Sequence, residues 1–248
     1  MSVAPLRPST TVLLVRDGAD GLEVLMVVRG DDKGQYASAM VFPGGALDAE
    51  DADEAWLPHL DGALGLDPAE RARRVAGFRE LYEETGVLLL EQPQRAPAGA
   101  PDERPFLDVV REAGGRLDLD AMIPFAHWVT PEGAPKRYDT HFRLCWRTTE
   151  MTAVSDGRET VAVEWLRPAE ALALGASKAR NLLFPTKCQL DLLAQSACVD
   201  QAVAAARSRR IVPVSPAMDR RPEGMFLSIP PESGYPEREF FMGRPQPA

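Results

Sequence analysis

Residues 67–87, with the sequence DPAERARRVAGFRELYEETGV, constrain the fold more than any other stretch because they carry the signals of one helix from its start to its end. Asp67 can cap the helix, Pro68 suits its first turn, and Gly86 follows the last periodic residue. Apolar side chains recur at the spacing of one helix face at Val75, Phe78, Leu81 and Tyr82. We therefore predict a helix that packs this face on a core.

The same helix brings Glu80, Glu83 and Glu84 within little more than one turn. Like charges at this spacing repel by about 0.2–0.5 kcal/mol per pair, and no Lys or Arg follows four residues later to relieve them. A solvated acidic face is the ordinary interpretation of such a run. Carboxylates at this spacing can also act together as hard oxygen ligands for Mg²⁺ or Mn²⁺, and the preceding Gly44-Gly45 turn has carbonyls that could face the same ion. This second interpretation explains why the chain accepts the repulsion.

The rest of the chain alternates strands with helices. Two β-branched apolar runs in residues 9–29 flank RDGADG, which predicts a hairpin. Further strands are predicted at 37–45, 87–90, 122–131, 138–147 and 159–168. Further helices are predicted at 106–113, 168–175 and 185–197, with an acidic, loosely helical segment at 48–66 and a Pro- and Ala-rich loop at 93–105. Interleaved strands and helices predict an α/β fold with a mixed sheet flanked by helices.

The charge balance limits the partners of this chain of 248 residues. Asp and Glu number 37 against 28 Lys and Arg, for a formal net charge of −9. This argues against a nucleic-acid polymer or an anionic membrane as the main partner, but not against a small phosphorylated ligand, which needs only a local positive site. The N-terminal apolar run at residues 11–15 is too short for a signal peptide or a membrane span, so a cytoplasmic location is expected. The oligomeric state is undecided, and a homodimer stays open.

The cysteines and histidines offer no second metal site by their spacing. The three cysteines lack a CxxC pattern and have apolar neighbours, which predicts buried, reduced thiols. His59, His127 and His141 show no metal-ligand spacing, so no zinc site is expected.

The helix and the turn before it carry a resemblance to a known family. The Gly-Gly turn followed by REL-x-EE-x-GV is similar to the Nudix hydrolase signature, G-x5-E-x7-R-E-U-x-E-E-x-G-U. The matching positions are Gly45, Arg79, Glu80, Leu81, Glu83, Glu84, Gly86 and Val87. The first half of the signature departs from the pattern, because the sixth residue after Gly45 is Asp51 and 27 residues separate it from Arg79, where the signature has seven. The roles of Asp51 and Glu50 stay open, and residues 52–66 are interpreted as a surface excursion that supplies no metal ligand.

The interrupted signature resembles one branch of this family, the branch that includes the peroxisomal coenzyme A diphosphatase. HWVTPEGAPKRYDTHFRL and LFPTKCQLDLL resemble two later segments of that branch, so that the likeness covers roughly residues 9–195. The resemblance implies a Nudix α/β/α sandwich with a mixed sheet in residues 1–200, interrupted by the insertion at about 52–66. The last forty residues hold eight of the 22 prolines, and residues 201–248 are predicted to be a Pro-rich extension draped over the domain.

The resemblance also implies site residues and a cofactor. Glu80, Glu83 and Glu84 would bind Mg²⁺ or Mn²⁺ with the help of the Gly44 carbonyl. Arg79 would orient Glu83, four residues later, unless it is an ordinary helix ion pair. The catalytic base would be Glu80 or a carboxylate on a later loop, for which Glu159 and Glu164 are candidates that could also be plain surface acids. Three basic residues would contact substrate phosphates: Arg29, Lys136 and Arg137.

The activity that the resemblance implies is metal-dependent hydrolysis of the diphosphate bond of a nucleoside diphosphate linked to another group. Coenzyme A or an acyl-coenzyme A is the leading substrate, and ADP-ribose and dinucleotides such as NADH are the alternatives. A Nudix module that binds a nucleotide without cleaving it is the alternative from another class. The presence of all three glutamates favours an enzyme.

Overall fold

A mixed eight-stranded sheet forms the centre of the molecule, in a computed structural model that describes residues 4–30, 38–91, 101, 104–146 and 152–243. The strand order is β10 (Asn181–Leu182), β3 (Ala39–Val41), β2 (Gly21–Arg29), β1 (Leu6–Gly18), β8 (Arg137–Trp146) and β7 (Ile123–Val129). Two further strands join this path, β4 (Gly44–Ala46) beside β1 and β9 (Thr160–Leu166) beside β2. The β1–β8 and β10–β3 pairs are parallel and the other pairs antiparallel, so the predicted mixed sheet is confirmed.

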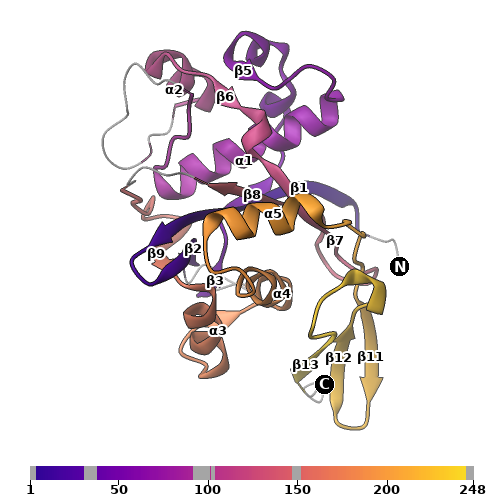
Figure 1. The fold of residues 1–248 in the computed structure, drawn as a ribbon. Helices are drawn as coiled ribbons and strands as arrows, with labels where there is room; N and C mark the ends of the chain where they lie inside the picture. Colours follow the sequence, from indigo (N-terminus) through magenta and orange to yellow (C-terminus); the bar gives the residue numbers. More distant parts are fainter. Residues whose placement is uncertain (1–3, 31–37, 92–100, 102–103, 147–151, 244–248) are drawn as a thin grey trace.

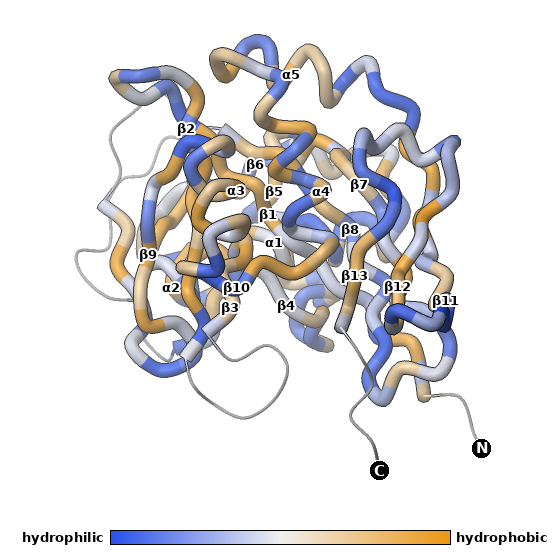
Figure 2. Tube along the Cα trace, turned by 90° about the horizontal axis from the view of Figure 1, so that it is seen from below, coloured by the Kyte–Doolittle hydropathy of each residue, from blue (hydrophilic) through white to orange (hydrophobic). Residues whose placement is uncertain are grey.

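Helices cover both faces of this sheet (Figure 1). One face carries α1 (Pro68–Thr85) and α2 (Phe106–Ala113), and the other carries α3 (Pro168–Ala176), α4 (Phe184–Leu193) and α5 (Val199–Ser208). Alternate side chains of β1 serve the two faces: Val12 and Leu14 belong to the core under α1, whereas Leu13 and Val15 belong to the core with α4 and α5. In Figure 2 the apolar segments gather around the central strands. This is the predicted α/β/α sandwich.

The local signals of the central helix are confirmed. The Asp67 side chain accepts a hydrogen bond from the Glu70 N–H at 2.9 Å, which caps α1. Gly86 takes the left-handed conformation with φ of 68°, and its N–H donates to the Tyr82 carbonyl at 2.7 Å. The predicted hairpin is also present, with Gly18 paired to Gly21 across a tight turn.

Other predictions need correction. The strand predicted at residues 87–90 is wrong: these residues form no ladder, although Val87, Leu89 and Leu90 are buried, because a core position can be filled by irregular backbone. The helix α5 was not predicted, although Val199, Ala202, Val203 and Ala206 recur at the spacing of one helix face and pack on the core. Most of the loop predicted at 93–105 lies outside the described residues.

The insertion is built into the structure. The 3-10 helix η1 (Ala49–Ala52) leads into it, and it contains the 3-10 helix η2 (Glu54–His59) and then β5 (Leu60–Asp61), which pairs in parallel with β6 (Leu117–Asp118). Trp56 and Leu60 are each 2% exposed, and the Trp56 ring lies 5.6 Å from the Phe106 ring. The predicted surface excursion is therefore wrong for these residues, since two apolar side chains outweigh the acidic average of the segment.

The C-terminal residues form a small antiparallel sheet of their own, with β11 (Ala217–Arg221), β12 (Gly224–Ser228) and β13 (Glu239–Gly243) beside the main sheet (Figure 1). The segment between β12 and β13 contains the 3-10 helix η4 (Pro231–Ser233) and is anchored through Tyr235, whose buried hydroxyl accepts from Trp128 Nε1 at 2.9 Å and donates to Gln189 Oε1 at 2.8 Å. Division of the chain near residue 200 stays a proposal, and α5 runs across that point. In the described part of the chain, no helix is long and apolar enough to cross a membrane.

Candidate functional site

A pocket of about 620 Å³ opens beside the second half of α1. Its acidic wall contains Glu80, Glu83, Glu84 and Glu159. Its apolar lining contains Val41, Phe42, Phe142, Leu183 and Pro185. The structure therefore brings the predicted metal-binding glutamates and one of the predicted bases, which are distant in the sequence, to one cavity.

The Gly44-Gly45 turn in β4 lets two carboxylates lie directly against the backbone. A Cβ atom added to Gly45 would lie 2.5 Å from Glu80 Oε1, so a larger residue would have to displace the Glu80 carboxylate. The N–H of Gly44 donates to Glu84 Oε2 at 3.1 Å. The predicted role of the Gly44 carbonyl as a metal ligand stays a prediction, because the contact seen here uses the N–H group.

Arg79 links the acidic side chains of the cluster through hydrogen bonds. Its Nη1 donates to Glu80 Oε1 at 2.8 Å and to Glu83 Oε2 at 2.9 Å, so the predicted contact with Glu83 is present. Its Nε and Nη2 form a two-bond pair with Asp51, at 2.9 Å for each bond, and Nη2 also donates to the Ala46 carbonyl. Arg79 is thus buried with its donors paired to acceptors from three segments of the chain.

Asp51 is the residue that the sequence reasoning left open. It is 1% exposed, and its carboxylate lies 28 positions before Arg79 in the chain. The signal for it was its place six residues after Gly45, but the insertion separated it from Arg79 in the sequence. Folding of the insertion closes that gap, so the interrupted signature is continuous in space.

Burial makes the charged form of these carboxylates costly. It raises the pKa of Glu80 to about 7, with Arg79 opposing the rise and Glu83 adding to it. Burial also raises the pKa of Glu84 well above its usual range, and the nearby Glu80 adds to this effect. The pKa of Glu83 is raised by burial as well. In this site the ionised carboxylates need compensating positive charge.

The donor set fits a divalent cation of the hard type. Three carboxylates on one helix supply only oxygen ligands, which Mg²⁺ and Mn²⁺ prefer. Arg79 and Arg29 provide part of the compensating charge; Arg29 lies on the pocket wall, 4.0 Å from Glu84 and 3.9 Å from Glu159. A bound divalent cation would supply the remainder.

Glu159 lies on a loop that is tied to the end of α1. The Asp156 carboxylate accepts the N–H groups of Arg158, Glu159 and Thr160, and these bonds hold its pKa below the usual range although burial alone would raise it. The Thr160 hydroxyl lies 3.0 Å from the Glu84 carbonyl, to which it can donate. Glu159 itself is 68% exposed within the pocket. Glu164, the other candidate, forms an ion pair with Arg180 at 2.9 Å.

Lys136 and Arg137 lie where the β7–β8 connection enters β8, between the pocket-lining residues Thr130 and Tyr138 in the sequence. Lys136 is exposed, and Arg137 Nε donates to the Thr130 carbonyl at 3.2 Å. Among the described residues, the pocket lining includes their neighbours Thr130 and Tyr138 but neither of the two basic side chains. Their contact with a substrate phosphate stays a prediction.

Two histidines that showed no ligand spacing in the sequence are neighbours in the fold. His127 on β7 pairs with His141 on β8, and Asp139 lies beside them. Burial and the nearby His127 lower the pKa of His141 to about 4. The sequence spacing of His127 and His141 gave no sign of this pair, because spacing does not reveal neighbours across antiparallel strands.

Comparisons with known proteins agree with the geometry. The sequence model described as the NUDT19 Nudix domain matches residues 58–187, which include Arg79 and the three glutamates. Acyl-coenzyme A diphosphatase NUDT19 of Homo sapiens is 28% identical over 214 residues, covering 64% of this chain and 57% of the relative. The protein of that name from Gallus gallus is 29% identical over 227 residues, covering 68% and 59%. The chain thus spans less than two thirds of the length of these relatives.

A solved structure is also similar to this chain. The crystal structure of a NUDIX hydrolase from Alicyclobacillus acidocaldarius is 25% identical, with a TM-score of 0.68, and the similarity covers 86% of this chain and all of that one.

Proposed function

Because the chain belongs to the NUDT19 Nudix domain family, we propose that it hydrolyses the diphosphate bond of a nucleoside diphosphate linked to another group, with coenzyme A or an acyl-coenzyme A as substrate. The observation that carries this proposal is the set of buried carboxylates on α1, held by Arg79 and the Gly44-Gly45 turn at one wall of a pocket. The names of the two acyl-coenzyme A diphosphatase relatives support the substrate class.

Glu80, Glu83 and Glu84 would hold Mg²⁺ or Mn²⁺ in this proposal. The bound cation would polarise the diphosphate and lower the pKa of a water molecule. Arg79 would orient Glu80 and Glu83, since it donates to both. Arg29, 3.9–4.0 Å from two of the acids, would contact a substrate phosphate.

A base must accept the proton of the attacking water, and the two predicted candidates that line the pocket, Glu80 and Glu159, differ in their surroundings. Glu80 is packed against Gly45 and bonded to Arg79. Glu159 is 68% exposed in the pocket on a loop fixed by Asp156, so a water molecule can reach its carboxylate. We therefore assign the role of base to Glu159 first and to Glu80 second.

The remaining surface of the pocket suits the rest of coenzyme A. The apolar lining, which includes Phe42 and Phe142, offers contacts for an adenine ring or for the pantetheine chain. Lys136 and Arg137, at the start of β8, would contact the 3′-phosphate, which ADP-ribose and NADH lack. Hydrolysis would then give an adenosine bisphosphate and a phosphopantetheine product.

The alternatives make different demands on the site. ADP-ribose and NADH would use the same acids and Arg29 without Lys136 and Arg137. A nucleotide sensor without activity would not need three glutamates and an intact Arg79 network, so we place it last. The cytoplasmic location and a homodimer remain predictions, as does the absence of nucleic-acid and membrane partners.

A substrate comparison with the purified chain tests the proposal. Coenzyme A, an acyl-coenzyme A, ADP-ribose and NADH would be incubated with Mg²⁺ or Mn²⁺, and the products would be separated by chromatography. We expect a phosphopantetheine product that disappears with EDTA and falls at least about 100-fold in a Glu83→Gln/Glu84→Gln variant. Glu223→Gln, at an exposed residue between β11 and β12, is the control and should keep its activity. Cleavage that continues undiminished in EDTA would overturn the metal-dependent proposal, and a preference for ADP-ribose would overturn only the substrate.

A further inference from the structure

We propose that His127, Asp139 and His141 form a second cation site, which takes a transition metal such as Zn²⁺ and is separate from the carboxylate site on α1. Among the described residues, these three are the group of His, Cys, Asp or Glu whose ligand atoms all lie within 4.8 Å of one another. They occupy the face of β8 opposite Thr140 and Phe142, which line the pocket, because side chains alternate along a strand.

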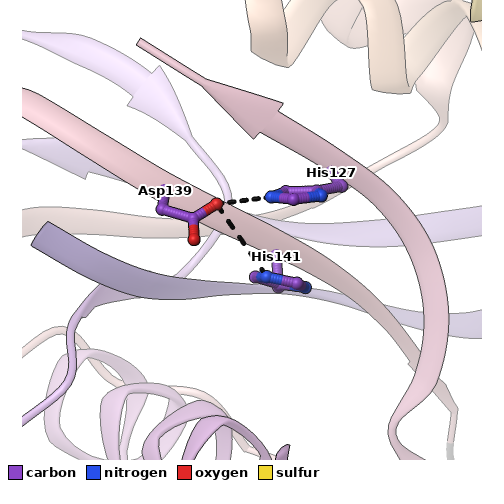
Figure 3. A group of neighbouring side chains, drawn as sticks. All are labelled: His127, Asp139 and His141. Carbon is purple, nitrogen blue, oxygen red and sulfur yellow. Dashed lines mark hydrogen bonds and ion pairs between the residues drawn. The ribbon is translucent and has the colours of Figure 1, made fainter. Parts of the chain in front are cut away.

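The sheet register creates the group. His127 on β7 is paired directly with His141 on β8, and Asp139 is paired with Val129 two residues further along. The two imidazole rings stack with their centroids 4.2 Å apart and an angle of 21° between their planes. Figure 3 shows both rings beside the Asp139 carboxylate, with the interactions of its Oδ1 marked. The β-ladder, rather than a flexible loop, holds the ligands in place.

The distances are close to those of a metal site. His127 Nε2 is hydrogen-bonded to Asp139 Oδ1, and His141 Nε2 lies 3.9 Å from the same oxygen. A tetrahedral cation with bonds of about 2.0–2.2 Å holds its ligand atoms about 3.4 Å apart. Movements of about an ångström would therefore bring all three atoms to one ion, within the range of side-chain rotations. A simple His–Asp hydrogen bond would account for the positions of His127 and Asp139. It would not account for His141, whose Nε2 faces the same Asp139 oxygen from 3.9 Å, beyond hydrogen-bond distance.

The ligand types of this group favour a different cation from the one that the acidic site would bind. Two imidazole nitrogens and one carboxylate suit Zn²⁺ and its neighbours in the first transition row, whereas Mg²⁺ prefers oxygen ligands alone. The three side chains are 21–25% exposed, so an ion and a water ligand have access. Three protein ligands leave the fourth position of a tetrahedral site open.

Arginines that share one glutamate, Glu70, lie near the group. Arg143, two residues after His141, is buried and donates to Glu70 Oε2 at 2.6 Å, and Arg73 lies 3.9 Å from the same atom. Arg74 Nε lies 2.8 Å from Glu70 Oε1 as well, so this one carboxylate offsets only part of the charge of three arginines. The Asp139 carboxylate, which lies beside the two imidazoles in Figure 3, is the negative charge that the group itself supplies to a cation.

Calorimetry with Zn²⁺ on the full chain tests this proposal while a millimolar excess of Mg²⁺ fills the acidic site. We expect one Zn²⁺ bound per chain, with affinity at least about 100-fold weaker in His127→Gln and in His141→Gln, because loss of even the outer partners of metal ligands costs about 10–100-fold. His59→Gln is the matched control, since His59 is far from the group in the sequence and on another element, η2, and it should bind as the wild type does. Circular dichroism checks that each variant is folded.

Three results would overturn the second site. The first is that the wild-type chain takes up no Zn²⁺. The second is that folded His127→Gln and His141→Gln bind it unchanged. The third is that the Glu83→Gln/Glu84→Gln variant abolishes Zn²⁺ binding, which would place the ion at the acidic helix. If a histidine variant does not fold, the wild-type titration and the Glu83→Gln/Glu84→Gln titration together still decide the matter. None of these results bears on diphosphate hydrolysis, which is measured separately.

Discussion

Replacing Glu80 with Gln should stabilise the metal-free protein near and above neutral pH. The amide has almost the same shape as the carboxyl group and can still accept the hydrogen bond from Arg79 Nη1. It removes a charge that is buried beside Glu83 and Glu84. The substitution therefore separates the electrostatic cost of the site from its packing.

The size of the effect follows from the pKa of Glu80. Folding raises it from 4.5 to about 7, mainly through burial, so the folded protein binds a proton that the unfolded chain has released. Stability is therefore lost as the pH rises through the window from about 4.5 to about 7. At about 1.4 kcal/mol for each pH unit, the full difference corresponds to about 3 kcal/mol. Because Glu80 interacts with Glu83 and Arg79, we expect a gain of about 1–3 kcal/mol in Glu80→Gln at about pH 8.

Urea unfolding in EDTA at about pH 8 and about pH 5 measures this gain, which should be much smaller at the lower pH. Adding Mg²⁺ or Mn²⁺ at the higher pH should reduce the stability gain of Glu80→Gln over the wild type. The cation stabilises the wild type more, because only the wild type keeps all three carboxylate ligands. Glu223→Gln is the control, since this glutamate is exposed in the turn between β11 and β12, and it should change little. Equal destabilisation of Glu80→Gln at both pH values would refute the reasoning, because it would mean that packing or the Arg79 bond dominates.

Three further predictions concern other parts of the chain. Trp56→Ala should lower the free energy of unfolding, measured in urea, by about 3–5 kcal/mol. Leu57→Ala, at a residue that is 43% exposed, should lower it far less. Similarly small losses for both variants would mean that the insertion is a surface excursion after all. Tyr235→Phe removes a hydroxyl with two buried hydrogen bonds and should cost about 1–3 kcal/mol in the same assay, and no loss would show that the C-terminal anchor is weak. Replacing Lys136 and Arg137 with Ala should reduce kcat/KM for coenzyme A at least about tenfold more than for dephospho-coenzyme A; an equal loss would show that the pair does not contact the 3′-phosphate.

Features that depend on neighbouring residues in the chain could be predicted from the sequence. The limits of α1 follow from Asp67 and Gly86, whose local hydrogen bonds form as expected. The cluster of Glu80, Glu83 and Glu84 follows from the helical repeat alone, because residues three and four apart share a face. The family resemblance rests on the same short stretch. These predictions succeed because the relevant contacts close within a few residues.

Features that depend on contacts between distant segments were decided only by the tertiary structure. The bond between Asp51 and Arg79 crosses an insertion whose acidic composition concealed the buried Trp56. The pairing of His127 with His141 depends on the register of two antiparallel strands, which their spacing does not reveal. Sequence patterns record which side chains share one element. They do not record which elements meet, because burial of apolar surface from the whole chain selects that arrangement.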